Sequence, residues 1–255
     1  MVNIKNHDFI EMSYTGRVHE TDEVFDTTDE TIAKAAGLFE EGASYKPIVI
    51  CVGKGHLIRG IDEQLIGKED GKSYRFSVEP EKAFGKKNPK LLKLMSSAMF
   101  KKQEIVPQPG LQVSVDGSVG MVRSATGGRV VVDFNHPLAG RQLDYDVTVV
   151  RILTAKDEQG RALARLLLGY EPKSVIIGDG KITFTVPMAV PEQIAHLLTK
   201  EFKELIGLEP VFTAEQKAQP EEAGAEAQQA EAHIHAHGEH EHSHGAEGHS
   251  HEKES

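Results

Sequence analysis

The chain has 255 residues, enough for two or three folded units, because one hydrophobic core usually serves about 100 to 200 residues. The formal net charge is -10, but residues 213–255 contain ten Glu and two Lys, so the rest of the chain is nearly neutral. This argues against nucleic acid as a partner, since phosphate binding needs clustered Lys and Arg. No segment approaches the roughly 20 apolar residues of a membrane span, and no signal peptide is evident. We therefore expect a cytoplasmic protein without a membrane partner.

Four segments in the first 150 residues alternate apolar and polar side chains and predict half-buried strands. They are residues 8–18, 48–52, 71–79 and 143–149. The apolar stretch Ile61–Leu65 predicts a helix that is too short to be stable unless it packs across a sheet. We expect an α+β fold in which a bent antiparallel sheet wraps this helix, formed by residues 1–87 and 134–155.

The single cysteine, Cys51, excludes an intrachain disulfide and agrees with a reducing compartment. It lies in the apolar run PIVICVG, which predicts a buried strand thiol rather than a nucleophile.

Residues 88–133, called the insert below, interrupt this first domain. The segments Asp116-Gly117 and Thr126-Gly127-Gly128 separate Val-rich stretches and are hairpin signals, so we predict a small β-rich unit. It holds more apolar residues than so small a unit can bury, which predicts a surface that binds client proteins. The candidate client-binding residues are Leu94, Met95, Met99, Phe100 and Met121.

Residues 156–212, called the C-terminal unit, predict a compact α+β domain. Arg161–Leu168 and Pro191–Ile206 are predicted helices, and a hairpin is predicted to turn at Gly178–Gly180. The second helix places its apolar residues on one face: Ile194, Leu197, Leu198, Phe202, Leu205 and Ile206. So small a unit needs a neighbour or a second copy to complete its core, and we expect a homodimer through it.

Residues 213–255 lack periodicity and predict a disordered tail rich in Glu and His. Imidazole is a ligand for nickel and zinc, so the histidines predict a metal-binding tail, with a merely solvating tail or a purification tag as alternatives. The candidate ligands are His233, His235, His237, His240, His242, His244, His249 and His251.

The sequence contains no arrangement typical of acid–base or nucleophilic catalysis. His56, His136 and His196 stand alone, and no Ser-His-Asp, Cys-His or paired-carboxylate spacing occurs around them. The segment GKEDGKS at 67–73 has one residue too few between its glycines for a phosphate-binding loop. We therefore predict no nucleotide site.

Five motifs occur in order: SYTGRV at 13–18, VFDTT at 24–28, VGKGHLIRGIDEQLIG at 52–67, EPEKAFG at 79–85 and LDYDV at 143–147. As an ordered set they resemble the FK506-binding-protein (FKBP) family of peptidyl-prolyl cis/trans isomerases. The interruption after Gly85 and the resumption at NHPLAG, residues 135–140, resemble the SlyD-like branch, which inserts a flap chaperone domain there. The added C-terminal unit resembles the long archaeal FKBP type.

This resemblance implies a pocket for an X-Pro segment, with Ile61 as its floor and the backbone N–H of Ile58 as a donor to a substrate carbonyl. The implied catalytic residues are Tyr14, Phe25, Asp26, Leu57, Ile58, Ile61, Phe84 and Tyr145, and Ile48 is implied as a substrate-binding neighbour. Two positions depart from the family pattern: Ile61 stands where single-domain relatives often have Trp, and Phe84 replaces a tyrosine.

Isomerisation explains why no catalytic base or nucleophile is evident. Rotation about an X-Pro amide has a barrier of about 18 to 20 kcal/mol and transfers no proton, so an apolar pocket suffices and no cofactor is required. The resemblance thus implies a folding isomerase with chaperone activity that acts on unfolded or proline-containing proteins. Two alternatives stay open, a non-catalytic holdase and a nickel or zinc metallochaperone that acts through its tail.

Overall fold

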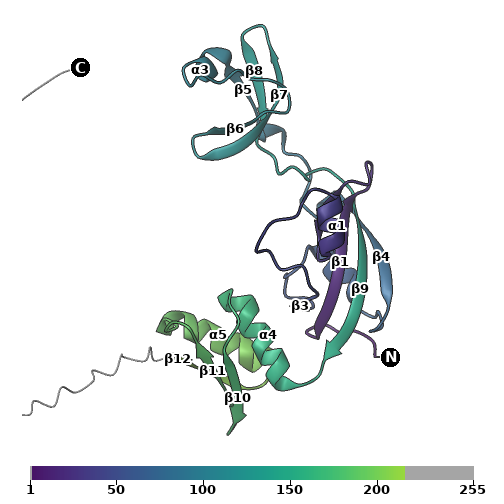
Figure 1. Cartoon of the computed structure of the whole chain (residues 1–255), viewed down its shortest axis with the longest axis vertical. Coiled ribbons are helices and arrows are strands. Elements are labelled where there is room, and N and C mark those ends of the chain that lie inside the picture. The colour runs from purple at the N-terminus through teal and green to yellow at the C-terminus, as the bar shows by residue number, and fades with distance from the viewer. Residues whose placement is uncertain (1, 216–255) are drawn as a thin grey trace, which may run out of the picture. The chain divides into compact units, whose positions relative to one another are not determined.

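A bent antiparallel sheet forms the first part of the computed structural model, which describes residues 2–215 (Figure 1). Its strands run in the order β2-β1-β9-β4, and β3 pairs with β1. The strands are β1 (Phe9–Val18), β2 (Val24–Thr27), β3 (Ile48–Cys51), β4 (Ser73–Val78) and β9 (Leu143–Leu153). All pairings are antiparallel, and β1 shifts register between Glu11 and Met12 and between Gly16 and Arg17. These irregularities bend the long central strand.

Helix α2 (Arg59–Leu65) packs against this sheet. Its Ile61 and Leu65 are buried in one core with Met12, Phe76 and Val147 of the strands. The bent antiparallel sheet over a short helix is therefore confirmed. A second helix, α1 (Glu30–Ala35), was not predicted, although its N-cap is readable in the sequence: the carboxylate of Asp29 accepts the N–H of Ile32.

The insert forms a four-stranded sheet with its own core. The strand order is β5-β8-β7-β6, and both predicted hairpins occur, with Asp116, Gly117, Gly127 and Gly128 at positive φ. Its elements are β5 (Leu92–Ser96), α3 (Ser97–Lys101), β6 (Gln112–Val115), β7 (Ser118–Thr126) and β8 (Arg129–Asp133). Two 3-10 turns precede β5: Pro80–Lys82 lies before the insert and Pro89–Leu91 at its start.

One predicted client-binding residue of the insert lies inside rather than outside. Phe100 is 2% exposed and packs with the valines of the sheet, because it fills the space between α3 and the strands. Met95 is half-buried against the same core, whereas Leu94, Met99 and Met121 are exposed. The apolar surface of the insert therefore depends on the exposed residues and not on Phe100.

The C-terminal unit comprises two helices and a three-stranded sheet. Its elements are α4 (Lys156–Leu168), β10 (Ser174–Gly178), β11 (Lys181–Val186), α5 (Glu192–Leu205) and β12 (Glu209–Ala214). The hairpin turns as predicted, with Asp179 and Gly180 at positive φ, and β12 pairs in parallel with β11. β12 ends two residues inside the segment expected to be tail.

The two helices also differ from the prediction. Helix α4 begins five residues before the predicted start. Two of the six apolar residues predicted on one face of α5, Ile194 and Leu197, are exposed.

The core of the C-terminal unit includes residues of the first sheet. Phe9 of β1, Cys51 of β3 and Leu153 of β9 are buried in one cluster with Phe184 and Phe202. The neighbour that completes this small core is thus the first sheet itself. Cys51 is fully buried, as predicted, and burial raises the pKa of its thiol to about 12. Within residues 2–215, no helix is long and apolar enough to cross a membrane.

Candidate functional site

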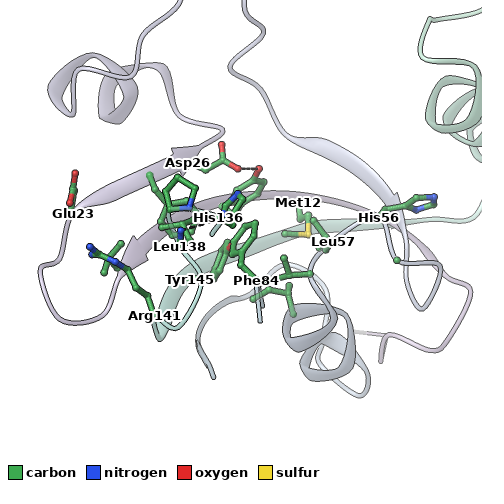
Figure 2. A pocket seen from close by; sticks show the side chains of 17 residues that line it. Met12, Glu23, Asp26, His56, Leu57, Phe84, His136, Leu138, Arg141 and Tyr145 are labelled. Carbon is green, nitrogen blue, oxygen red and sulfur yellow. Dashed lines mark hydrogen bonds between the residues drawn. The ribbon is translucent and has the colours of Figure 1, made fainter. Parts of the chain in front are cut away.

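A pocket of about 880 Å³ opens where the sheet, α2 and the segment 84–85 meet the NHPLAG segment (Figure 2). All eight residues implied as catalytic by the motif order line it: Tyr14, Phe25, Asp26, Leu57, Ile58, Ile61, Phe84 and Tyr145. They come from β1, β2, β9, α2 and two loops. Ile61 is 2% exposed and belongs to the core of the sheet, so the inner end of the pocket is apolar and rigid.

Aromatic rings form one wall of the pocket. The rings of Phe25 and Tyr145 meet edge to face with their centroids 5.7 Å apart, and Tyr14 lies 6.1 Å from Tyr145. The approach of Phe25 depends on Gly16, because a Cβ there would lie 2.6 Å from the tip of the Phe25 ring. Gly16 is therefore a structural requirement of this wall.

Tyr14 and Asp26 form the pocket's clearest polar contact. The Tyr14 hydroxyl donates to Oδ2 of Asp26 at 2.7 Å, and this bond is drawn in Figure 2. Burial raises the pKa of Tyr14, and the neighbouring Asp26 carboxylate raises it further. Burial likewise raises the pKa of Tyr145. Both phenols therefore stay protonated near neutral pH, and the bond holds the side chains of β1 and β2 in place.

Phe84 is stacked on His136. The ring centroids are 4.3 Å apart and the planes differ by 2°. Nδ1 of His136 accepts the backbone N–H of Leu138, which fixes the ring on the NHPLAG segment. Phe84, which replaces the tyrosine of the family pattern, is thus covered by the imidazole ring of His136.

The residues before α2 form a turn that carries a free donor to the pocket. The buried carboxylate of Asp62 accepts the N–H of Gly53 at 3.0 Å and that of Gly55 at 3.2 Å. Gly53 has φ +82°, and a Cβ there would lie 1.8 Å from Oδ1 of Asn6, so only glycine fits. Within residues 2–215 the N–H of Ile58 has no protein acceptor. It therefore remains available to a ligand in the pocket.

Some predicted site residues lie elsewhere. Ile48 does not line this pocket; it borders a separate cavity of about 440 Å³ with Leu153 and Ala162. The candidates in the insert are also not among the pocket residues. The histidines proposed as metal ligands lie outside the described residues. Within residues 2–215, no group of three or more His, Cys, Asp or Glu side chains could hold a metal ion.

Sequence reasoning missed nine lining residues. They are Met12, Val18, Glu23, Gly55, His56, His136, Pro137, Leu138 and Arg141. Four of them, His136, Pro137, Leu138 and Arg141, belong to NHPLAG or follow it directly. The motif is visible in the sequence, but only the tertiary structure shows that it forms a wall of the pocket. His136 and His56, which stand alone in the sequence, both border the pocket.

Comparison with known proteins gives a consistent set of relatives. The chain matches the family "FKBP-type peptidyl-prolyl cis-trans isomerase" over residues 2–102 and the family "FKBP26, IF domain" over residues 93–138. It is 32% identical over 160 residues to a short-type peptidyl-prolyl cis-trans isomerase of Methanocaldococcus jannaschii, covering 62% of this chain and 100% of the relative.

Two bacterial groups are also similar. The chain is 36% identical over 112 residues to the FKBP-type 16 kDa peptidyl-prolyl cis-trans isomerase of Escherichia coli, which covers 42% of this chain and 74% of the relative. It is 28% identical over 126 residues to the FKBP-type isomerase SlyD of Haemophilus influenzae, which covers 48% of this chain and 66% of the relative.

Proposed function

This chain belongs to the family of FKBP-type peptidyl-prolyl cis-trans isomerases, and we propose that it rotates X-Pro bonds in the pocket floored by Ile61 and walled by Phe25 and Tyr145. The single observation that carries this assignment is the convergence of all eight motif residues on one apolar pocket. The family's reaction needs no cofactor, because it breaks no covalent bond.

The pocket suits bond rotation. The planar amide is stabilised by resonance that must be lost on the way to the twisted state, at a cost of about 18 to 20 kcal/mol. Water stabilises the more polar planar form, so transfer of the bond between Ile61 and the aromatic rings favours the twisted state. The free N–H of Ile58 is a donor for a substrate carbonyl, and the bond between Tyr14 and Asp26 holds the wall before substrate arrives.

A protease-coupled assay on a short proline peptide tests the pocket. We expect turnover by the wild type, and a fall in kcat/KM of about tenfold or more in Phe84→Ala and Ile61→Ala, because each removes apolar surface that contacts the prolyl bond. Phe39→Ala is the matched control, since Phe39 is an exposed aromatic residue outside the pocket lining. An inactive wild type would favour the non-catalytic holdase instead.

Ile61→Ala needs a check of folding. Ile61 is buried in the sheet core, and we expect its truncation to lower the free energy of unfolding by about 2 to 5 kcal/mol. Ile61→Val, with an expected loss of about 1 kcal/mol, separates pocket shape from stability. Activity is compared only at temperatures where each variant is folded.

We propose that the insert binds unfolded clients through its exposed apolar side chains. Leu94 is 62% exposed and Val119 is 57% exposed, although the insert has a complete small core of its own. A client held there presents its prolines to the pocket at an effective concentration on the order of millimolar. This supports chaperone activity in addition to isomerisation.

Deleting residues 88–133 should reduce catalysed refolding of a protein substrate far more than turnover of a short peptide. A gentler variant, Leu94→Ser with Met99→Ser, should have the same selective effect, since both side chains are exposed and leave the core intact. Phe100→Leu serves as control, because Phe100 is buried and its replacement leaves the surface unchanged. Equal losses in both assays would contradict a client site on the insert.

The remaining proposals concern assembly, metal and location. The C-terminal unit exposes Ile176, Met188 and Leu197, which supports a homodimer, and light scattering of the full chain tests it.

The histidines of residues 233–251 support nickel or zinc binding by the tail. A chain that ends at Glu215 keeps β12 whole. In a nickel titration it should bind fewer metal ions per chain than the full-length protein. The composition and the lone cysteine support a cytoplasmic location.

A further inference from the structure

The turn Gly53–His56, called the glycine turn, leads directly into the pocket. Leu57, labelled in Figure 2, and Ile58 follow it, and both line the pocket. From inside the domain the turn is held by the Asp62 carboxylate, which accepts the N–H groups of Gly53 and Gly55. Two glycines at positive φ have large conformational freedom in the absence of such contacts, so the position of the next residues depends on what holds the turn.

The same turn is also held by the C-terminal unit. Nζ of Lys54 donates to Oε2 of Glu201 at 3.0 Å and to Oε1 of Glu204 at 2.8 Å, and both glutamates lie on α5. The Lys54 side chain is 20% exposed, whereas those of Glu201 and Glu204 are 36% and 43% exposed, so the contact is shielded from water on the lysine side only. The hydrogen bonds that Lys54 donates to these carboxylates, the one to Glu204 foremost, raise the pKa of Lys54, and the lysine ammonium lowers the pKa of Glu204. The contact between Lys54 and Glu204 therefore stays charged across the neutral range.

The strand that enters the turn is shared between two cores. Cys51 is buried with Phe184 and Phe202 of the C-terminal unit, whereas the next residue, Val52, is buried in the core of the first sheet. The glycine turn thus starts at the place where the two cores meet. A displacement of α5 would be transmitted to it through both the Cys51 packing and the Lys54 ion pairs.

We propose that Lys54, Glu201 and Glu204 are positioning residues for the isomerase reaction, through which α5 fixes the N–H of Ile58 at the edge of the pocket. A donor that is already in place does not have to be ordered when substrate binds, which favours affinity and turnover. The C-terminal unit then supports catalysis as well as assembly. This inference rests on the proposed function of the pocket.

The test uses the full chain and the short proline peptide, with kcat and KM measured separately. We expect Lys54→Gln, and independently Glu201→Gln with Glu204→Gln, to lower kcat/KM by about threefold to tenfold, mainly through a higher KM, on the scale of partly shielded ion pairs. Lys54→Arg should stay within about twofold of the wild type, because the guanidinium keeps the positive charge and has enough N–H donors for both carboxylates. Thermal unfolding of each variant establishes that the protein is folded at the assay temperature.

Glu158→Gln is the matched control. It removes an ion pair between Arg151 of β9 and Glu158 of α4, which also joins the first sheet to the C-terminal unit, yet neither residue lines the pocket. We expect its kcat/KM to stay within about twofold of the wild type. An equal loss in this control would overturn the inference, because any contact between the two parts would then suffice.

The outcomes separate the inference from the function on which it rests. An active wild type whose Lys54→Gln and double glutamate variants keep the same KM and kcat would overturn the positioning role alone. An inactive wild type would overturn the proposed function and this inference with it.

Discussion

The bond between Tyr14 and Asp26 joins two strands at the pocket wall. Its donor is a phenol whose pKa is raised by burial and by the carboxylate that accepts the bond. A phenol that is protonated throughout the neutral range cannot act as a base there, and isomerisation requires no proton transfer. The contact therefore organises the pocket, and its loss should change geometry rather than chemistry.

Asp26→Ala should lower kcat/KM by about tenfold, the scale of one hydrogen bond to a charged group, with a rate that stays flat from about pH 6 to about pH 9. Tyr14→Phe should give a similar loss, and the double variant should be no worse than either single variant, because both changes remove the same bond. The measurement is kcat/KM as a function of pH for the wild type, the two single variants and the double variant. Loss of activity in Asp26→Ala together with a steep new pH dependence would contradict a purely organising role of the carboxylate.

At the scale of elements, the segment between β3 and α2 is stabilised by one histidine as well as by Asp62. Nδ1 of His56 accepts the backbone N–H of Cys51 at 3.1 Å, which requires an unprotonated Nδ1. Burial is the main cause that lowers the pKa of His56 below its usual 6.5. The segment therefore contains a group that protonates more easily in the unfolded chain than in the folded one.

The sign of the resulting pH dependence follows from linkage. Above about pH 6.5 His56 is neutral in both states and its contribution is complete; as the pH falls, the unfolded chain binds the proton first, so stability is lost down to the folded pKa. Between about pH 7 and about pH 5, urea unfolding should show a steeper loss of stability for the wild type than for His56→Asn.

Other titrating groups contribute equally to the wild type and to His56→Asn, so the difference between the two pH curves reports on His56 alone. His19 has a pKa raised by its hydrogen bond to Asp144, so it contributes in the opposite sense, but it is present in both proteins. Parallel pH curves for the wild type and His56→Asn would contradict a role for His56.

At the scale of the whole molecule, the described residues have three hydrophobic cores, of which two meet at the first sheet. The sheet buries Ile10 and Met12 with α2, and it buries Phe9 and Cys51 with the C-terminal unit. The insert has a separate core around Val122. The first sheet and the C-terminal unit should therefore unfold together, whereas the insert can open by itself.

Hydrogen exchange tests this division. Phe9→Ala should cost about 3 to 5 kcal/mol and reduce protection of α5 amides, although Phe9 lies in β1, because its ring belongs to the core of the C-terminal unit. Phe100→Ala is the matched change in the insert and should reduce protection there while leaving α5 unchanged. Equal loss of α5 protection in both variants would show that the three cores unfold as one.

Local features of the fold were predictable because neighbouring residues determine them. The hairpin at Asp116-Gly117 follows from two residues that tolerate positive φ, and α5 follows from its apolar periodicity. The face of α5 was only partly right: Phe202 is buried, but Leu197 is 68% exposed. Periodicity predicts which side of the helix is apolar, whereas the sheet that packs on that side decides how many of its apolar residues are buried.

The site was predictable as far as the ordered motifs reach. Resemblance identified residues such as Tyr14 and Phe84, and it misplaced Ile48, which borders the separate cavity with Leu153 and Ala162. His136 was not predicted, because its stacking on Phe84 joins residues 52 positions apart across the insert.

The sequence by itself determined four strands of the first sheet, the hairpin turns and the family, since these depend on local pattern and on motif order. Only the tertiary structure decided which residues share a core or a pocket: that Cys51 packs with Phe202, that Phe100 is buried, and that Lys54 meets two glutamates of α5. The physical reason is that these contacts join residues far apart in the chain, and no local periodicity encodes which distant surfaces meet.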